Sequence, residues 1–291
     1  MYKILIILLA PIVLFAKLNI AVTYPYIGAI TKTIGGESVD TTVLSKGNWD
    51  PHFIVPRPSL ISKIRNSDGI IINGAQLEIG WLPQLVRRSG NSKVNISSKS
   101  FLNLSTYIDL VTIVKFTDRS AGDVHPNGNP HFHLDPENIL IIANVIKGYL
   151  SVLDSSNKAL YEKNYKEFQR AWKEKMTIWS KKMADKRGLK VIQFHNNMAY
   201  FNKRYGIKTI GTIEPLPGIP ASSKHTMELI ELVKEKKPKY IFQDVYHQTK
   251  SAKYISAKTG IEVITMPHDI GSLDEIEDLT SLFDYLVHAI K

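Results

Sequence analysis

Short apolar segments alternate with longer amphipathic segments along the first part of the chain. Residues Gly69–Asn73 read Gly-Ile-Ile-Ile-Asn, and such β-branched content is typical of a buried strand. The pattern predicts strands at Leu18–Thr23, Val39–Leu44 and Gly69–Asn73, and helices at Ile27–Ile34, Leu60–Asn66 and Ile79–Arg88. Because strands and helices take turns at this spacing, we expect βαβ units and a parallel sheet.

The pattern changes at Pro136, where an apolar helix is predicted over Glu137–Leu153. Residues 155–186 then contain neither Pro nor Gly, many Lys and Glu, and apolar residues at helical spacing. They predict a helix of about 30 residues, which is about 45 Å long. Its apolar spacing is too irregular for the heptads of a coiled coil. We therefore expect one long helix that joins two parts of the molecule.

The alternation resumes after Gly188. It predicts strands at Lys190–Phe194, Thr209–Ile213, Tyr240–Gln243 and Glu262–Met266, and helices at Met198–Tyr205, Lys224–Lys236, Lys250–Thr259 and Leu273–Ile290. The expected fold class is α/β, with two lobes, each a parallel-type sheet flanked by helices, joined by one long central helix. The expected boundaries are a leader at 1–16, an N-terminal lobe at 17–153, the linking helix at 154–187 and a C-terminal lobe at 188–291.

Residues 1–16 have the pattern of a signal peptide. Lys3 precedes an apolar run, and the small residue Ala16 ends it. The run is too short to span a bilayer, so we expect cleavage after Ala16, with an uncleaved anchor as the alternative. The sequence has no cysteine, which excludes disulfides, thiolate ligands and a lipid anchor on an N-terminal cysteine. An exported protein without a lipid anchor is expected in a periplasm.

The net charge of +10 raises the question of a nucleic-acid partner. Lys and Arg are interspersed with Glu and Asp, most clearly from Lys158 to Arg187, and no stretch combines basic and aromatic residues in a binding motif. We interpret the charge as a solvated basic surface, and we expect a monomer without a nucleic-acid partner.

Three histidines occur in distinctive loop settings. They are His52 in Asn-Trp-Asp-Pro-His, His131 in Gly-Asn-Pro-His-Phe-His and His195 in Gln-Phe-His-Asn-Asn. His195 and Asp269 lie just after predicted strands, and ligands of parallel α/β sheets bind beyond the carboxyl ends of strands. Imidazoles and one carboxylate are ligands that zinc prefers. The sequence therefore predicts a zinc site of His52, His131, His195 and Asp269 in a cleft between the lobes.

Nearby residues leave alternatives open for this site. His133 could be an auxiliary ligand, although in an extended segment it would point away from His131. Asp244, which follows another predicted strand, and His268 compete with Asp269 for the fourth position.

Other polar residues are expected outside the ligand set. Asp50 could orient the His52 ring, and Asp135 could cap the helix that follows it. The remaining histidines are interpreted as surface residues: His125, His225, His247 and His288. Of these, His125 could pass metal on.

These motifs resemble, in the same order along the chain, those of the zinc and manganese solute-binding proteins of ABC importers. The motifs are Asp50-Pro51-His52 with Pro58-Ser59, Asn129-Pro130-His131 with Asp135-Pro136, and Phe194-His195 with Ala199-Tyr200-Phe201. The resemblance implies two α/β lobes tied by a rigid helix, a metal between them, and delivery to an ABC permease in the membrane. It also implies that His52, His131 and His195 are ligands, with Asp269 where the acidic ligand usually lies.

The sequence departs from the family pattern at several positions. His133 stands where an aromatic residue is common, Asp244 replaces a more usual Glu, and no long loop rich in His and acidic residues precedes Asn129. Manganese members tend to carry Glu at the position of His195. The nitrogen donor there favours zinc, with manganese as the alternative.

Three functions are weighed on this basis. The first is a periplasmic receptor that captures zinc for an ABC permease and is not an enzyme. The second is a zinc hydrolase, which needs an open coordination position and a general base, and the sequence has no His-Glu-x-x-His motif. The third is a metal-independent surface adhesin, and the sequence leaves adhesion open as a side role.

Overall fold

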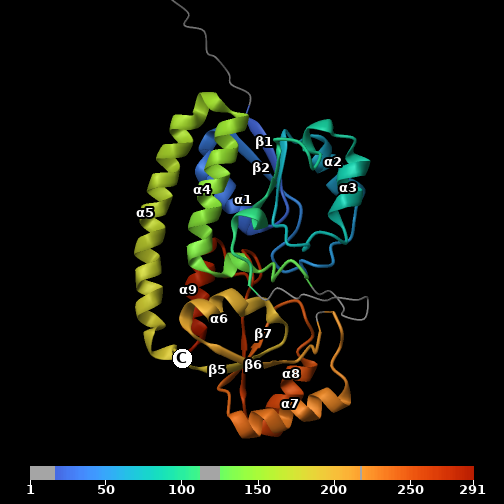
Figure 1. The fold of residues 1–291 in the computed structure, drawn as a ribbon, viewed down its shortest axis with the longest axis vertical. Helices are drawn as coiled ribbons and strands as arrows, with labels where there is room; N and C mark the ends of the chain where they lie inside the picture. Colours follow the sequence, from blue (N-terminus) through green and yellow to red (C-terminus); the bar gives the residue numbers. More distant parts are fainter. Residues whose placement is uncertain (1–16, 112–124, 217) are drawn as a thin grey trace, which may run out of the picture.

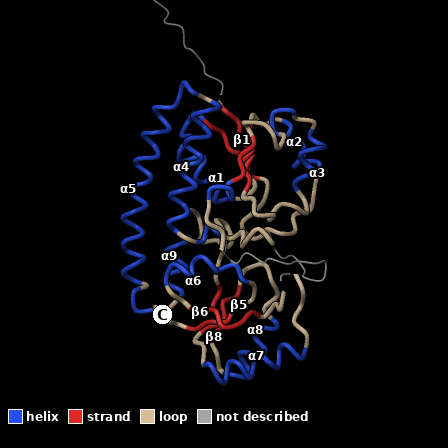
Figure 2. Tube along the Cα trace, in the orientation of Figure 1, coloured by secondary structure: helices blue, strands red, loops and turns tan. Residues whose placement is uncertain are grey.

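Two parallel sheets, one above the other, lie beside a long helix (Figures 1 and 2). The computed structural model describes residues 17–111, 125–216 and 218–291, so the predicted leader at 1–16 lies outside the described residues. The first sheet has the strand order β2-β1-β3-β4 and the second the order β6-β5-β7-β8. All neighbouring strands are parallel. The predicted fold class is therefore confirmed.

The elements alternate as the sequence pattern indicates. The first lobe contains β1 (Leu18–Val22), α1 (Pro25–Gly35), β2 (Val39–Val43), α2 (Pro58–Arg65), β3 (Gly69–Ile72), α3 (Leu82–Ser89), β4 (Phe101–Asn103) and α4 (Pro136–Leu153). The long helix is α5 (Lys158–Lys182). The remainder contains β5 (Lys190–Gln193), α6 (Ala199–Tyr205), β6 (Lys208–Thr212), α7 (Ser223–Lys236), β7 (Tyr240–Gln243), α8 (Lys250–Thr259), β8 (Glu262–Thr265) and α9 (Leu279–Ala289).

Three elements differ from the predicted ones. Strand β4 was not predicted because three residues are too few to show an alternating pattern. The predicted helix over 155–186 is α-helical only in α5, and a 3-10 turn lies at each end. Helix α9 begins later than predicted because Asp278 caps it, in a reciprocal capping box with Ser281.

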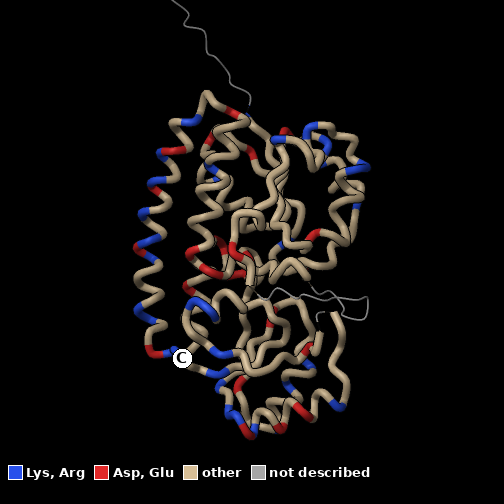
Figure 3. The backbone as a smooth tube through the Cα atoms, in the orientation of Figure 1, with Lys and Arg blue, Asp and Glu red and all other residues tan. Residues whose placement is uncertain are grey.

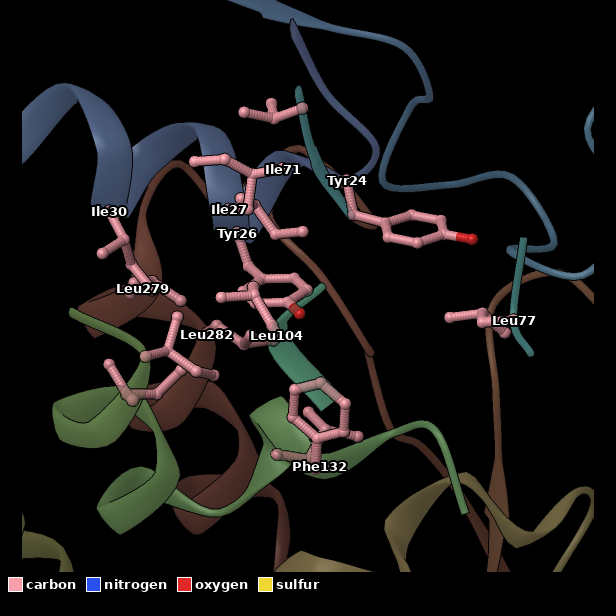
Figure 4. Packing of buried hydrophobic residues seen from close by; sticks show 14 of the residues in the cluster. Tyr24, Tyr26, Ile27, Ile30, Ile71, Leu77, Leu104, Phe132, Leu279 and Leu282 are labelled. Atoms are coloured by element: carbon pink, nitrogen blue, oxygen red, sulfur yellow. The ribbon is translucent and has the colours of Figure 1, made fainter. Parts of the chain in front are cut away.

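The largest hydrophobic core crosses the boundary between the lobes. Figure 4 shows Ile30 of α1 close to Leu279 and Leu282 of α9, in a cluster that also contains Tyr26 and Ile27. The C-terminal helix thus packs against the first lobe, whereas a smaller core lies entirely within the second. The predicted lobe boundaries stay a prediction, and α9 shares a core with both sides of them.

Helix α5 is attached near both lobes by two buried tryptophans. The Trp172 Nε1–H donates to the carbonyl oxygen of Pro136 at 2.9 Å, at the start of α4. The Trp179 Nε1–H donates to Asp284 Oδ1 of α9 at 2.7 Å. Both indoles also contact Phe283, with ring centroids 5.5 and 5.1 Å away. These contacts restrict α5 to one position.

Charged residues of both signs are mixed along α5 and α7 (Figure 3). This distribution agrees with a solvated surface rather than with one strongly basic face. Among the described residues, no helix has the length and apolar content needed to cross a membrane.

Candidate metal centre

The structure brings three of the four predicted ligands together. The ligand atoms of His52, His131 and His195 lie within 4.8 Å of one another. The ring centroids are 5.3 Å apart for His52 and His131, 5.2 Å for His52 and His195, and 5.4 Å for His131 and His195. His52 and His131 come from the first lobe and His195 follows β5 of the second. The group therefore lies where the two lobes meet.

His52 is oriented by a carboxylate two residues before it. The Asp50 Oδ1 lies 2.8 Å from His52 Nδ1 and accepts the His52 backbone N–H at 3.0 Å. The predicted role of Asp50 as an orienting group is thus supported by its contacts. The loop approaches the second lobe closely at Gly47. A Cβ at this position would lie 1.8 Å from the carbonyl oxygen of Ile270.

His131 is positioned by a turn that also links the lobes. The Asn129 Oδ1 accepts the His131 backbone N–H at 2.9 Å, and the Asn129 side-chain amide donates to the carbonyl of Asn196 at 2.6 Å. The Tyr200 hydroxyl donates to the Asn129 carbonyl at 2.8 Å. The turn that carries His131 is therefore fixed by residues adjacent to His195.

Asp135 has two roles near His131. It caps α4 by accepting the backbone N–H of Glu137, as predicted, and Pro136 occupies the first turn. It also forms a two-point ion pair with Arg204 of α6, at 2.8 and 2.9 Å. Such bidentate pairs are geometrically specific, so Asp135 fixes α4 relative to the second lobe.

His195 belongs to a chain of charged side chains in the second lobe. Its Nδ1 lies 2.8 Å from Glu214 Oε2, and Glu214 Oε1 lies 3.3 Å from His247 Nε2. The His247 Nδ1 in turn lies 2.9 Å from Asp244 Oδ2. The two carboxylates raise the pKa of His247 to about 10, against the opposing effect of burial, and the two histidines lower the pKa of Glu214 to about 2. The chain therefore places a fixed negative charge on the Nδ1 side of His195.

The ring nitrogens of the group fit a metal ion. Nε2 of His52 and both nitrogens of His131 are buried without a hydrogen-bond partner among the described residues. Burial lowers the pKa of His131 well below its ordinary value, and burial also lowers the pKa of His195. Buried polar atoms are normally satisfied, so converging neutral nitrogens without a hydrogen-bond partner are suited to hold a cation.

The fourth predicted ligand, Asp269, lies outside this group. Its Oδ1 accepts the backbone N–H of Ile270 at 2.7 Å, and its carboxylate lies against the backbone of Tyr26 in the first turn of α1. A helix N-terminus attracts a carboxylate, which explains this orientation. Burial nevertheless raises the pKa of Asp269 well above its ordinary value. Asp269 stays a prediction as a ligand, and binding would require it to leave α1.

His133 and His268 are both buried but are engaged elsewhere. The His133 ring stacks on Tyr26 with centroids 4.3 Å apart, and its Nε2 lies 2.7 Å from the carbonyl oxygen of His268. Burial lowers the pKa of His133 to about 3 and that of His268 to about 4. The contact between His133 and His268 joins the lobes, which accounts for a histidine at position 133.

Three residues at the site were misjudged or missed from the sequence. His125 and His247 were interpreted as surface residues, and this is wrong, because both rings lie beside the group of three histidines. Glu214 was not recognised as the partner of His195. Both Glu214 and His247 lie just beyond the carboxyl ends of strands, and that position was the available signal.

A two-lobed α/β fold with histidines from both lobes at their junction defines a metal-binding receptor. The family model described as ZnuA, the periplasmic zinc-uptake complex component A, matches residues 20–291. The chain belongs to this family, whose members are substrate-binding receptors of ABC importers. Family membership confirms the predicted resemblance and the expectation of a receptor rather than an enzyme.

Curated relatives differ in the metal that their names give. The manganese ABC transporter substrate-binding lipoprotein PsaA of Streptococcus pneumoniae is 28% identical over 254 residues, which cover 85% of this chain and 78% of the relative. The iron ABC transporter substrate-binding lipoprotein MtsA of Streptococcus pyogenes is 28% identical over 253 residues, with the same coverage.

Solved structures of this kind share the fold. A crystal structure of ZnuA superposes with a TM-score of 0.78 at 24% identity and covers 94% of this chain and 99% of its own. A manganese-bound periplasmic metal binding protein from Candidatus Liberibacter asiaticus has a TM-score of 0.74 at 20% identity, covering 94% and 98%. These likenesses establish the two-lobed architecture.

Proposed function

We propose that this protein is a periplasmic zinc receptor, in which His52, His131 and His195 hold the ion and which delivers it to an ABC permease. The observation that carries the proposal is the convergence of three histidines within 4.8 Å, with buried ring nitrogens that lack partners. We expect the receptor to act as a monomer. The bound ion is cargo, so the site needs no general base and no substrate pocket.

The donor atoms favour zinc over manganese. Three imidazoles give a nitrogen-rich set, which suits zinc, whereas manganese prefers more oxygen ligands. The nearby carboxylates of Asp50 and Glu214 bind the Nδ1 atoms of two rings rather than pointing at the group of nitrogens. Manganese remains the alternative cargo, and Asp269 would supply the oxygen that it prefers.

Cellular uptake tests the proposed role in import. A strain that lacks this gene should take up radioactive zinc slowly in chelated medium, and the wild-type gene should restore uptake while His195→Ala should not. The control is manganese uptake in the same cells, which should not change. Restoration of zinc uptake by His195→Ala would contradict the proposal.

Removing the carboxylate behind His195 should weaken zinc binding. Glu214 accepts the Nδ1–H of His195 and so leaves the Nε2 lone pair for the metal. We expect Glu214→Ala to weaken zinc affinity by about 10- to 100-fold in a competition with a chelator. The matched control is Glu228→Ala on α7, which removes an exposed carboxylate and should have no effect. Equal affinities of the two variants would argue against this orienting role.

Zinc affinity should decrease as pH falls, because protons compete with the metal for the imidazole nitrogens. Burial lowers the pKa of His131 and His195, so these rings stay neutral to lower pH than exposed histidines. The loss of affinity should therefore be centred below pH 6.5, the ordinary value for histidine. Zinc affinity would be measured by titration between about pH 4.5 and 8, a range that spans the ordinary pKa of histidine. The protonation of the competing chelator would be corrected for at each pH. A midpoint above pH 6.5 would contradict buried neutral ligands.

A further inference from the structure

A fourth histidine lies beside the group of three. The His125 ring stacks on His52, with centroids 5.3 Å apart and an angle of 30° between the planes. Both side chains line one cavity of about 590 Å³. The Nε2 of His125 is buried and has no hydrogen-bond partner among the described residues. An unsatisfied ring nitrogen at the edge of a metal centre needs an explanation.

The unpartnered ring nitrogen of His125 resembles that of a proposed ligand. Its Nε2, like the Nε2 of His52, is buried without a hydrogen-bond partner among the described residues. In His52 and His195 the Nδ1 is held by Asp50 and Glu214, and a hydrogen bond at one ring nitrogen leaves the other nitrogen free for a metal. The His125 ring itself lies against the backbone of Ala75.

The backbone on both sides of this contact is restrained. Ala75 has a φ of +50°, which is uncommon for a residue with a side chain, and its N–H donates to Ser105 Oγ at 2.9 Å. The turn from His125 closes with a bond from the Gly128 N–H to the His125 carbonyl at 3.0 Å. Gly128 has a φ of +116°, and a Cβ there would lie 2.6 Å from Leu110 Cβ. The same turn continues into the segment that carries His131.

We propose that His125 is the fourth zinc ligand, which gives this receptor a site of four imidazoles. This assignment rests on the proposed function and replaces Asp269 in the fourth position, because Asp269 is held at the start of α1. His125 lies outside the group within 4.8 Å, so it moves toward the other rings when zinc binds. Four neutral nitrogens satisfy the tetrahedral preference of zinc and discriminate against manganese.

X-ray absorption of the zinc-loaded protein counts the imidazoles directly. The wild type should show four, the variant His125→Gln three, and Asp269→Asn four. In chelator competition His125→Gln should weaken zinc binding by at least about tenfold, since each of four ligands contributes a share of the binding free energy. The control His288→Gln removes an exposed histidine of α9 and should change neither result.

The outcomes separate this inference from the proposed function. Three imidazoles in the wild type, with unchanged affinity in His125→Gln, would overturn the assignment of His125 while the receptor proposal stands. A loss of one oxygen ligand and of affinity in Asp269→Asn would restore Asp269 as the fourth ligand. No tight zinc binding by the wild type would overturn both proposals. Cobalt-loaded protein gives an independent check, because its visible spectrum should shift in His125→Gln only.

Discussion

Replacing His131 with alanine is expected to abolish tight zinc binding while leaving the metal-free protein folded. Zinc sites contribute about 10–16 kcal/mol, so one of four ligands accounts for about 3–4 kcal/mol, or roughly a hundred- to a thousandfold in affinity. The His131 ring makes no hydrogen bond through either nitrogen in the described structure. Removing it therefore costs no protein–protein hydrogen bond and removes two unsatisfied polar atoms.

Thermal unfolding with and without zinc measures both parts of this prediction. The metal-free His131→Ala protein should unfold near the temperature of the metal-free wild type. Excess zinc should stabilise the wild type, because it binds only the folded state, and should not stabilise the variant. A variant that unfolds early without metal would show that His131 is a structural residue, and one that zinc still stabilises would show that it is not a ligand.

Replacing Trp179 with alanine should cause a large loss of stability. The indole is fully buried between α5 and α9, stacks on Phe283 and donates to Asp284. Removing such a side chain lowers the free energy of unfolding by about 3–5 kcal/mol. For a chain of this length that corresponds to a decrease in Tm of roughly 10 °C.

The adjacent residue supplies the matched control for this prediction. Ile178 on the same turn of α5 is 57% exposed, so Ile178→Ala should change the free energy of unfolding by less than about 0.5 kcal/mol. Chemical unfolding of both variants gives the comparison. Similar losses in the two variants would mean that α5 does not depend on its contact with α9.

The rigid attachment of α5 bears on how metal is captured and released. Trp172 and Trp179 hold the helix near both lobes, and Asp135 and Arg204 join α4 to α6. Such restraints oppose a wide hinge motion, because buried contacts would have to break. Metal exchange is then expected through loops near the site, such as the turn that carries His125, rather than through separation of the lobes.

Much of the fold follows from local sequence patterns. β-branched runs followed by amphipathic segments identify strands such as β3, and the absence of Gly and Pro over 155–186 identifies α5. Strand β4 has only three residues and is recognised through its pairing with β3, which a local pattern does not contain. The position of α9 against α1 depends on contacts between distant segments for the same reason.

The candidate ligands were predictable where position and residue type agreed. His195 follows β5 directly and the loop with His52 follows β2, so topology places them at one edge. The orientation of the Asp269 side chain was not predictable, because it contacts Tyr26, a residue far away in sequence. His247 follows β7 and so had a positional signal, but its contact to Glu214 in a neighbouring loop is not contained in a local pattern.

A competition titration tests the central claim most directly. Purified protein stripped of metal would be titrated with zinc and with manganese against a chelator of known affinity. Binding of one zinc ion per chain with a Kd of about 1 nM or tighter, and of manganese far more weakly, is the predicted result, because nitrogen donors favour zinc. Tighter binding of manganese would contradict zinc as cargo, and the absence of tight binding by either metal would contradict the metal-receptor account of His52, His131 and His195.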